Sequence, residues 1–123
     1  MLKTLVSATA LVSVALLQGC DGTSVSYTQD VQPILSKHCS ECHLPGGQGE
    51  EASGFLVDSY TSVLKGTKHG PVVVAGDPLS SSLYRLISGR VDKSIQMPHS
   101  KEPLPVSEIE LIEKWINEGA KDN

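Results

Sequence analysis

The sequence predicts an all-α fold of about four short helices joined by long loops. Apolar residues recur at helical spacing in four segments, as expected of helices that bury one face. The three valines 72–74 have the composition of a strand, but no second run of this kind is present to pair with them. The loops are longer than a compact domain normally contains, which favours loops that wrap a bound group.

The composition of the 123-residue chain indicates one small domain with few large core side chains. Its aromatic content is only 4 %, which favours a bound group at the centre of the domain. The formal net charge is −4, and the Lys and Arg residues are scattered singly rather than gathered in a patch. We therefore expect no nucleic-acid partner, and we expect a neutral or basic surface on any docking protein.

The N-terminal residues have the layout of an export signal. Lys3 precedes an apolar run, 5–17, that is too short to span a bilayer comfortably. The stretch LLQGC, which ends at Cys20, resembles the lipobox of bacterial lipoproteins and implies cleavage before Cys20 and acylation of that residue. The alternative is an ordinary cleaved signal that releases a soluble protein. The predicted division is a lipoprotein signal peptide over 1–19, a lipidated tether over 20–29 and a folded domain over 30–123.

The first predicted helix is capped by Asp30 and has Pro33 in its first turn, where a missing amide donor costs nothing. Its apolar face holds Val31, Ile34 and Leu35. His38 shares this face and is expected to be structural. The helix runs directly into two cysteines, and a glycine-rich loop is predicted after them over 44–54.

Two further helices are predicted in the middle of the chain. Asp58 is expected to cap the first of them, which ends at Gly66. Asp77 is expected to cap the second, with Pro78 at its first position and Gly89 after its end. The predicted apolar faces hold Tyr60, Val63 and Leu64 in one helix, and Leu79, Leu83, Leu86 and Ile87 in the other.

The last predicted helix begins with a capping box formed by Ser107 and Glu110 and runs to about Asn117. Gly119 closes it. Its apolar stripe holds Ile109, Ile112 and Ile116, with Leu111 and Trp115 beside them. The segment before it, 89–105, is expected to be irregular because of its prolines and charges.

Cys39 and Cys42 are separated by two residues and followed at once by His43. This pattern is typical of c-type haem attachment, in which the thiols add to the two vinyl groups and the histidine binds the iron. A zinc site would need a second ligand pair, and a thioredoxin-like dithiol would need a βαβ unit; the sequence offers neither. With Cys20 lipidated and the other two cysteines bound to haem, no cysteine is left over.

A low-spin haem iron needs a sixth ligand, and Met97 is the first candidate. It is the only methionine that remains after removal of the signal, and thioether sulfur is a common iron ligand in cytochromes c. Pro98 follows it and restricts the local conformation. His99 and His69 are the alternatives.

Four sequence blocks in this order resemble the small single-haem cytochrome c domain first noted in planctomycetes, within the class I cytochrome c family. They are VQPILSKHCSECH, GPVVVAGDPLSSSLYRLI, QMP and IEKWINEGA, and the resemblance covers about residues 29–120. It implies a class I cytochrome c-like fold around one haem c, bound covalently through Cys39 and Cys42, with His43 and Met97 as axial ligands. It also implies that the first and last helices pack at an angle, with Val31, Ile34 and Leu35 against Ile109, Ile112 and Trp115.

The function expected from these residues is one-electron transfer without substrate chemistry, by a monomer that meets extracytoplasmic redox proteins. The location expected is the periplasmic side of a bacterial membrane, held by the lipid on Cys20, or the soluble periplasm. Two other functions stay open: a haem-based ligand binder or sensor in which Met97 leaves the iron, and a structural lipoprotein without haem. The loop Gly70–Gly76 is expected to cover the porphyrin, and Arg85 or Arg90 either pairs with a propionate or is a solvated surface charge.

Overall fold

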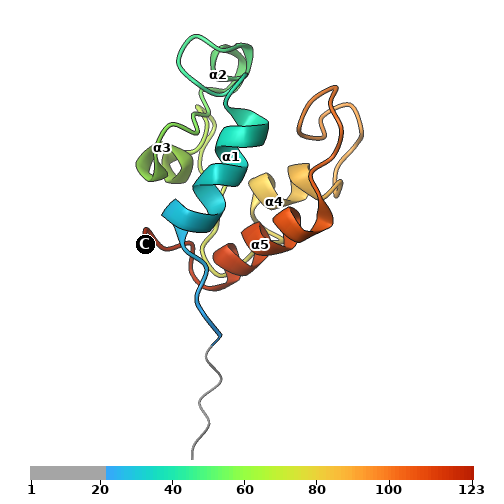
Figure 1. Cartoon of the computed structure of the whole chain (residues 1–123). Coiled ribbons are helices and arrows are strands. Elements are labelled where there is room, and N and C mark those ends of the chain that lie inside the picture. The colour runs from blue at the N-terminus through green and yellow to red at the C-terminus, as the bar shows by residue number, and fades with distance from the viewer. Residues whose placement is uncertain (1–21) are drawn as a thin grey trace, which may run out of the picture.

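The computed structural model describes residues 22–123 of the chain. These residues contain five short α-helices and no strand (Figure 1). The predicted signal peptide and Cys20 lie outside the described residues. The helices are α1 (Gln32–Cys39), α2 (Gln48–Ser53), α3 (Tyr60–Lys65), α4 (Ser82–Ile87) and α5 (Val106–Asn117), and a π-helical turn η1 (Tyr27–Val31) leads into α1. The predicted all-α class is confirmed, with α2 as a helix that the sequence did not predict.

The first helical turn begins earlier than the predicted cap at Asp30. Ser26 is the N-cap of η1, and its hydroxyl accepts a hydrogen bond from the amide of Gln29 at 3.1 Å. Asp30 acts from inside the turn, where its carboxylate accepts a hydrogen bond from the amide of Ser26 at 2.8 Å. The two side chains therefore satisfy backbone donors in both directions, as in a capping box.

The core forms where α5 crosses the start of the first helical segment (Figure 1). Tyr27 of η1 packs on Trp115 of α5 with their ring centroids 5.6 Å apart. The residues predicted to join the first and last helices all lie in this core, although Ile109 is only partly buried. The most deeply buried large side chains are Trp115, Leu35, Ile112, Ile116, Val31 and Val63.

Helix α3 is capped one residue later than predicted, by Ser59, whose hydroxyl accepts a hydrogen bond from the amide of Ser62 at 3.2 Å. The helix ends at Gly66, whose φ of 80° suits a residue without a side chain. Val63 is completely buried, and the hydroxyl of Tyr60 donates a hydrogen bond to the carbonyl of Ala120 at 2.8 Å. Helix α3 is thus tied to the end of the chain beyond α5.

Helix α4 begins at Ser82, so Asp77 does not cap it. The carboxylate of Asp77 instead accepts hydrogen bonds from the amide and hydroxyl of Ser80 in a separate turn. Leu79, predicted on the apolar face of the helix, lies in that turn and is 61 % exposed. Leu83 and Ile87 are buried as predicted.

Helix α5 begins at Val106, with Pro105 at the N-cap position. Ser107 therefore lies inside the helix, and the predicted capping box is wrong because no side chain caps this end. Ile112, Trp115 and Ile116 are buried as predicted. The chain leaves the helix through Gly119, whose φ of 100° permits the turn that returns the amide of Ala120 to the carbonyl of Trp115.

Candidate functional site

A cavity of about 370 Å³ lies among the end of α1, α2, α4 and the segment that contains Met97. Its walls are mainly apolar and include Phe55, Val72, Leu83, Leu86 and Ile87. Cys39, Cys42, His43 and Met97 all line it, so the structure brings the four residues predicted to bind a haem to one site. His38 and His99 also line the cavity, whereas His69 is exposed and does not.

One turn of chain carries the two thiols and the imidazole. Cys39 is the last residue of α1, and its carbonyl accepts hydrogen bonds from the amides of Cys42 at 3.2 Å and His43 at 2.9 Å. Both thiols are free. Burial raises the pKa of Cys39 to about 11, and the nearby Cys42 adds to this effect, so Cys39 is a neutral thiol near pH 7.

His43 is held in one tautomer by the backbone of Phe55. Its Nδ1 atom lies 3.1 Å from the carbonyl oxygen of Phe55, and because a carbonyl only accepts, Nδ1 must carry the proton. Nε2 is then the atom with the free lone pair, as an iron ligand requires. The ring of Phe55 packs edge-on against the imidazole with the centroids 5.2 Å apart, which further fixes the orientation of His43.

Two glycines allow α2 to approach this turn closely. A β-carbon on Gly47 would lie 2.4 Å from the carbonyl oxygen of Cys42, and one on Gly49 would lie 2.6 Å from Cε1 of His43. The amide of Glu50 donates to the carbonyl of Cys42 at 3.0 Å. Phe55 and these glycines were not identified from the sequence; the only signal was the glycine content of the loop predicted over 44–54.

Met97 lies in the irregular segment between α4 and α5 and lines the cavity. Its amide donates a hydrogen bond to the carbonyl of Leu86 at 3.1 Å, which ties this segment to α4. The side chain is partly buried and packs against the core. The peptide bond between Met97 and Pro98 is cis.

A family profile described as planctomycete cytochrome C matches residues 39–100 of the chain. The chain belongs to the planctomycete cytochrome c family. A domain of this cytochrome c family implies a c-type haem and a role as an electron carrier rather than an enzyme, and the family suggests an extracytoplasmic location. No curated protein and no solved structure matches the chain.

The cavity of this cytochrome c domain fits the group that the family implies. Two free thiols on one turn, an imidazole with a free Nε2 and a thioether all line a cavity with apolar walls. These are the donors that a covalently bound c-type haem requires. Among residues 22–123, no group of three or more His, Cys, Asp and Glu side chains could hold a metal ion, so the zinc alternative gains no support there.

Of the other residues expected near the haem, some line the cavity, some lie in the core and some lie at the surface. Of the three valines in the loop Gly70–Gly76, Val72 lines the cavity, Val73 is buried in the core and Val74 is exposed. Arg85 and Arg90 do not line the cavity, and the guanidinium of Arg90 lies over the ring of Tyr84, 5.7 Å from its centroid.

A basic side chain that the sequence analysis missed lies at the edge of the cavity. Lys101 lines the cavity and forms an ion pair with Glu41 of the turn that carries Cys39 and Cys42. The hydrogen bond that its ammonium donates to the carboxylate of Glu41 is the main cause that raises the pKa of Lys101. The pair joins the segment after Met97 to the turn that carries Cys42, at the edge of the cavity.

His38 is partly buried near the end of α1, where it lines the cavity and has a polar partner. Its Nε2 atom lies 2.5 Å from a carboxylate oxygen of Glu108, and the ammonium of Lys37 lies 3.1 Å from the other oxygen. Burial alone would raise the pKa of Glu108, but the hydrogen bonds from Lys37 and His38 outweigh it and lower the pKa. This cluster connects α1 to the first turn of α5 beside the cavity.

None of the helices within residues 22–123 has the length and apolar character needed to cross a bilayer.

Proposed function

We propose that the mature protein is a one-electron carrier that holds a single c-type haem through thioether bonds to Cys39 and Cys42, with His43 and Met97 as axial iron ligands. The observation that carries this proposal is the convergence of these four residues on one apolar cavity in a cytochrome c domain. Bound there, the haem supplies one-electron iron redox chemistry. The protein residues would then orient the axial ligands, exclude water from the haem and keep atomic movement on electron transfer small.

The surroundings of His43 suit the role of an iron ligand. The hydrogen bond from Nδ1 to the carbonyl of Phe55 orients the ring and increases the basicity of Nε2. The contact with Gly49 blocks rotation of the ring on the other side. A fixed ligand favours fast electron transfer because little has to move when the charge changes.

The packing of Met97 favours a function as an electron carrier over that of a haem-based ligand binder. A ligand binder requires the sixth ligand to leave, but the backbone of Met97 is tied to Leu86 and its side chain packs against the core. A soft thioether ligand in an apolar cavity also stabilises the reduced iron and raises the reduction potential. His99 lines the same cavity and is the competing ligand.

The proposed place of action is the periplasmic side of a bacterial membrane, with the protein held by acyl chains on Cys20. Its sequence context supports this proposal, because LLQGC stands at the end of an apolar run of the right length. Two or more acyl chains give a stable anchor, whereas one chain does not. The partners proposed are extracytoplasmic redox proteins that meet a monomeric carrier through small, transient interfaces.

A pyridine haemochrome spectrum of the exported protein tests the central claim. We expect the spectrum of haem bound through two thioether bonds, retained after denaturation and acid–acetone extraction. Substitution of both Cys39 and Cys42 by Ala should make the haem extractable or prevent its incorporation. A wild-type protein without covalent haem would refute the proposal and favour a structural lipoprotein.

A further inference from the structure

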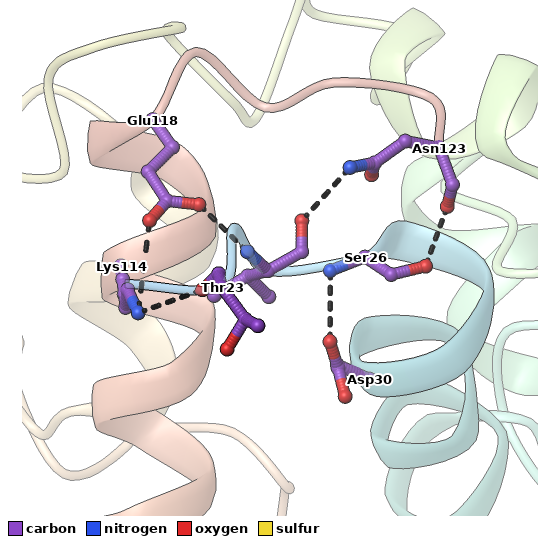
Figure 2. Close-up of polar contacts among 7 residues, drawn as sticks. Thr23, Ser26, Asp30, Lys114, Glu118 and Asn123 are labelled. Carbon is purple, nitrogen blue, oxygen red and sulfur yellow. Dashed lines mark hydrogen bonds and ion pairs between the residues drawn. The ribbon is translucent and has the colours of Figure 1, made fainter. Parts of the chain in front are cut away.

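The segment between the predicted anchor and the first helix is built into the domain. Residues 20–29 were expected to form a tether, yet Val25 and Tyr27 within them are buried to 7 % and 2 % exposure. Figure 2 shows this segment lying along the end of α5 and the chain that follows it. Of the segment 20–29, the structure describes residues 22–29.

Two side chains of the C-terminal part hold the backbone of this segment. The carboxylate of Glu118 accepts a hydrogen bond from the amide of Val25 at 2.8 Å (Figure 2). The side-chain oxygen of Asn123 accepts one from the amide of Tyr27 at 2.9 Å, and its side-chain nitrogen donates one to the carbonyl of Val25 at 3.2 Å. We call this arrangement, residues 23–28 held by Lys114, Glu118 and Asn123, the terminal clasp.

Further contacts close the clasp on both sides. The ammonium of Lys114 donates to the carbonyl of Thr23 at 3.2 Å and lies 3.7 Å from the carboxylate of Glu118. The backbone carbonyl of Asn123 accepts hydrogen bonds from the hydroxyl of Ser26 at 2.6 Å and the amide of Thr28 at 3.1 Å. Five of the six residues 23–28 thus make hydrogen bonds to the C-terminal part, and Val25 and Tyr27 are also buried, so this segment is part of the fold, not a flexible linker.

The opening of the haem cavity lies away from the clasp, although the cavity itself extends to α4, which packs beside α5. In Figure 1 the N-terminal segment leaves at one end, and α2, which forms one wall of the cavity, lies at the other. The exposed residues that line the cavity mark its opening, and they are Gln48, Ala52, His99 and Lys101. Helix α1 runs between the two ends, and its eight residues give a length of about 12 Å from the clasp side to Cys39.

We propose that the terminal clasp orients the cytochrome, keeping the opening of the haem cavity turned away from the anchoring bilayer and toward soluble redox proteins of the aqueous compartment. This inference rests on the proposed lipidation of Cys20 and the proposed haem. It assigns the electron-exchange partner to the aqueous phase rather than to the membrane that holds the anchor.

Chain lengths show why the clasp decides the orientation. From Cys20 to Thr23 an extended chain spans at most about 11 Å, which is far less than the diameter of roughly 30 Å of a small domain. The cavity opening therefore cannot turn to face the bilayer while the clasp is closed. With the clasp open, the free chain from Cys20 to Tyr27 reaches about 25 Å, which approaches that diameter, so the domain can then turn far enough to bring the cavity opening near the bilayer.

Amide hydrogen exchange of the lipidated holoprotein in detergent micelles tests the clasp itself. The amides of Val25 and Tyr27 should exchange slowly in the wild type. In the double variant Glu118→Ala/Asn123→Ala we expect faster exchange, on the order of tenfold for each hydrogen bond lost. Glu110→Ala is the matched control, because Glu110 is exposed on the same helix and should leave the exchange unchanged. An unaltered haem spectrum establishes that the double variant is folded.

Energy transfer to the haem tests the orientation. The lipidated protein is bound to phosphatidylcholine vesicles that contain a small fraction of phosphatidylethanolamine labelled with a fluorophore on its head group. The haem should quench this probe weakly in the wild type. Quenching should increase severalfold in the double variant and after insertion of a flexible Gly–Ser linker of about six residues between Asp21 and Gly22.

Equal quenching in the wild type and the linker variant would overturn the orienting role. Rapid exchange of the Val25 and Tyr27 amides in the wild type would overturn the clasp. Failure of the holoprotein to float with the vesicles would instead overturn the lipid anchor, and the orienting role with it. The exchange experiment measures the protection of the clasp amides without a bilayer, so these failures are distinguishable.

Discussion

The imidazole of His43 lies against Gly49 so closely that a β-carbon on Gly49 would stand 2.8 Å from the Nδ1 atom of the ring. This contact makes Gly49 a test of how rigidly the proposed iron ligand is held. Alanine is favoured over glycine by about 1 kcal/mol in a helix, so α2 alone would gain from Gly49→Ala. We expect the opposite result, because the new methyl group must displace His43 or α2.

For Gly49→Ala, the free energy of unfolding of the holoprotein should fall by about 1–3 kcal/mol, the usual cost of overpacking. The low-spin absorption spectrum should change as well. Gly22→Ala is the control, since a β-carbon there meets no atom within 4 Å. A variant as stable as the wild type with an unchanged spectrum would show that His43 is not held by α2.

The sixth ligand is tested by Met97→Ala. The ferric wild-type protein should show the weak charge-transfer band from sulfur to iron, and the variant should lose it. The reduction potential should also fall, since axial ligands set haem potentials within a range of about 0.8 V. His99→Ala and His69→Ala should retain the band. If the wild type lacks the band and His99→Ala alters the low-spin spectrum, then His99 is the ligand.

The helices were predictable wherever a buried face imposed a period on the sequence. Val63, Leu83 and Ile112 fall at such positions and are buried. The predicted first turns were less accurate, because Ser and Asp side chains bond to nearby amides in turns as readily as at helix ends. Asp77 does this with Ser80, and the turn displaces Leu79 to the surface.

Helix α2 gave no signal because none of its residues is buried and it therefore has no apolar face. It forms where Gly47 and Gly49 allow the backbone to approach Cys42 and His43 closely. Such an approach depends on which segments meet in space, and a single sequence does not encode this as a pattern.

The attachment motif of the proposed haem site could be recognised in the sequence because its residues are local, with Cys39, Cys42 and His43 on one turn. The partner of His43 could not be recognised, since the carbonyl of Phe55 is a backbone group that any residue would supply. The ion pair between Lys101 and Glu41 joins residues 60 positions apart, so no local sequence pattern predicts it. Residue type thus indicated the proposed ligands, and only the fold shows the groups that orient them.

Two tyrosines in the same core differ in whether their hydroxyls are satisfied. The hydroxyl of Tyr27 is buried without a hydrogen-bond partner among the described residues, whereas that of Tyr60 donates to Ala120. Burial is the main cause that raises the pKa of Tyr27 to about 12, and the negative charge of Asp122 adds to it.

Tyr27→Phe should therefore leave the free energy of unfolding unchanged or raise it, because an unsatisfied buried hydroxyl costs stability. Tyr60→Phe should lower it by about 1 kcal/mol through loss of a hydrogen bond. The rings of the two tyrosines touch, with centroids 5.1 Å apart, so each variant controls for the other in the same packing environment. Equal losses in urea denaturation would mean that Tyr27 has a polar partner in solution.

The cluster of Glu108 with Lys37 and His38 predicts a pH dependence of stability. Burial raises the pKa of Glu108, but the hydrogen bonds from the two basic side chains outweigh it and bring the pKa below its ordinary value of 4.5. A carboxylate with a lowered pKa in the folded state stabilises the protein above its unfolded-state pKa. This contribution is lost as the pH falls through the folded-state pKa, when the carboxylate takes up a proton.

Glu108→Gln should thus lower the free energy of unfolding at pH 7 by up to about 1 kcal/mol, the range of a partly exposed ion pair. The difference from the wild type should shrink as the pH falls below about 4.5. Urea denaturation at several pH values measures it, with the fluorescence of Trp115 reporting its separation from the haem. Glu110→Gln, on the exposed side of the same helix, should follow the wild type at every pH. A loss in Glu108→Gln that is constant from pH 3 to pH 7 would assign the effect to packing of the side chain rather than to its charge.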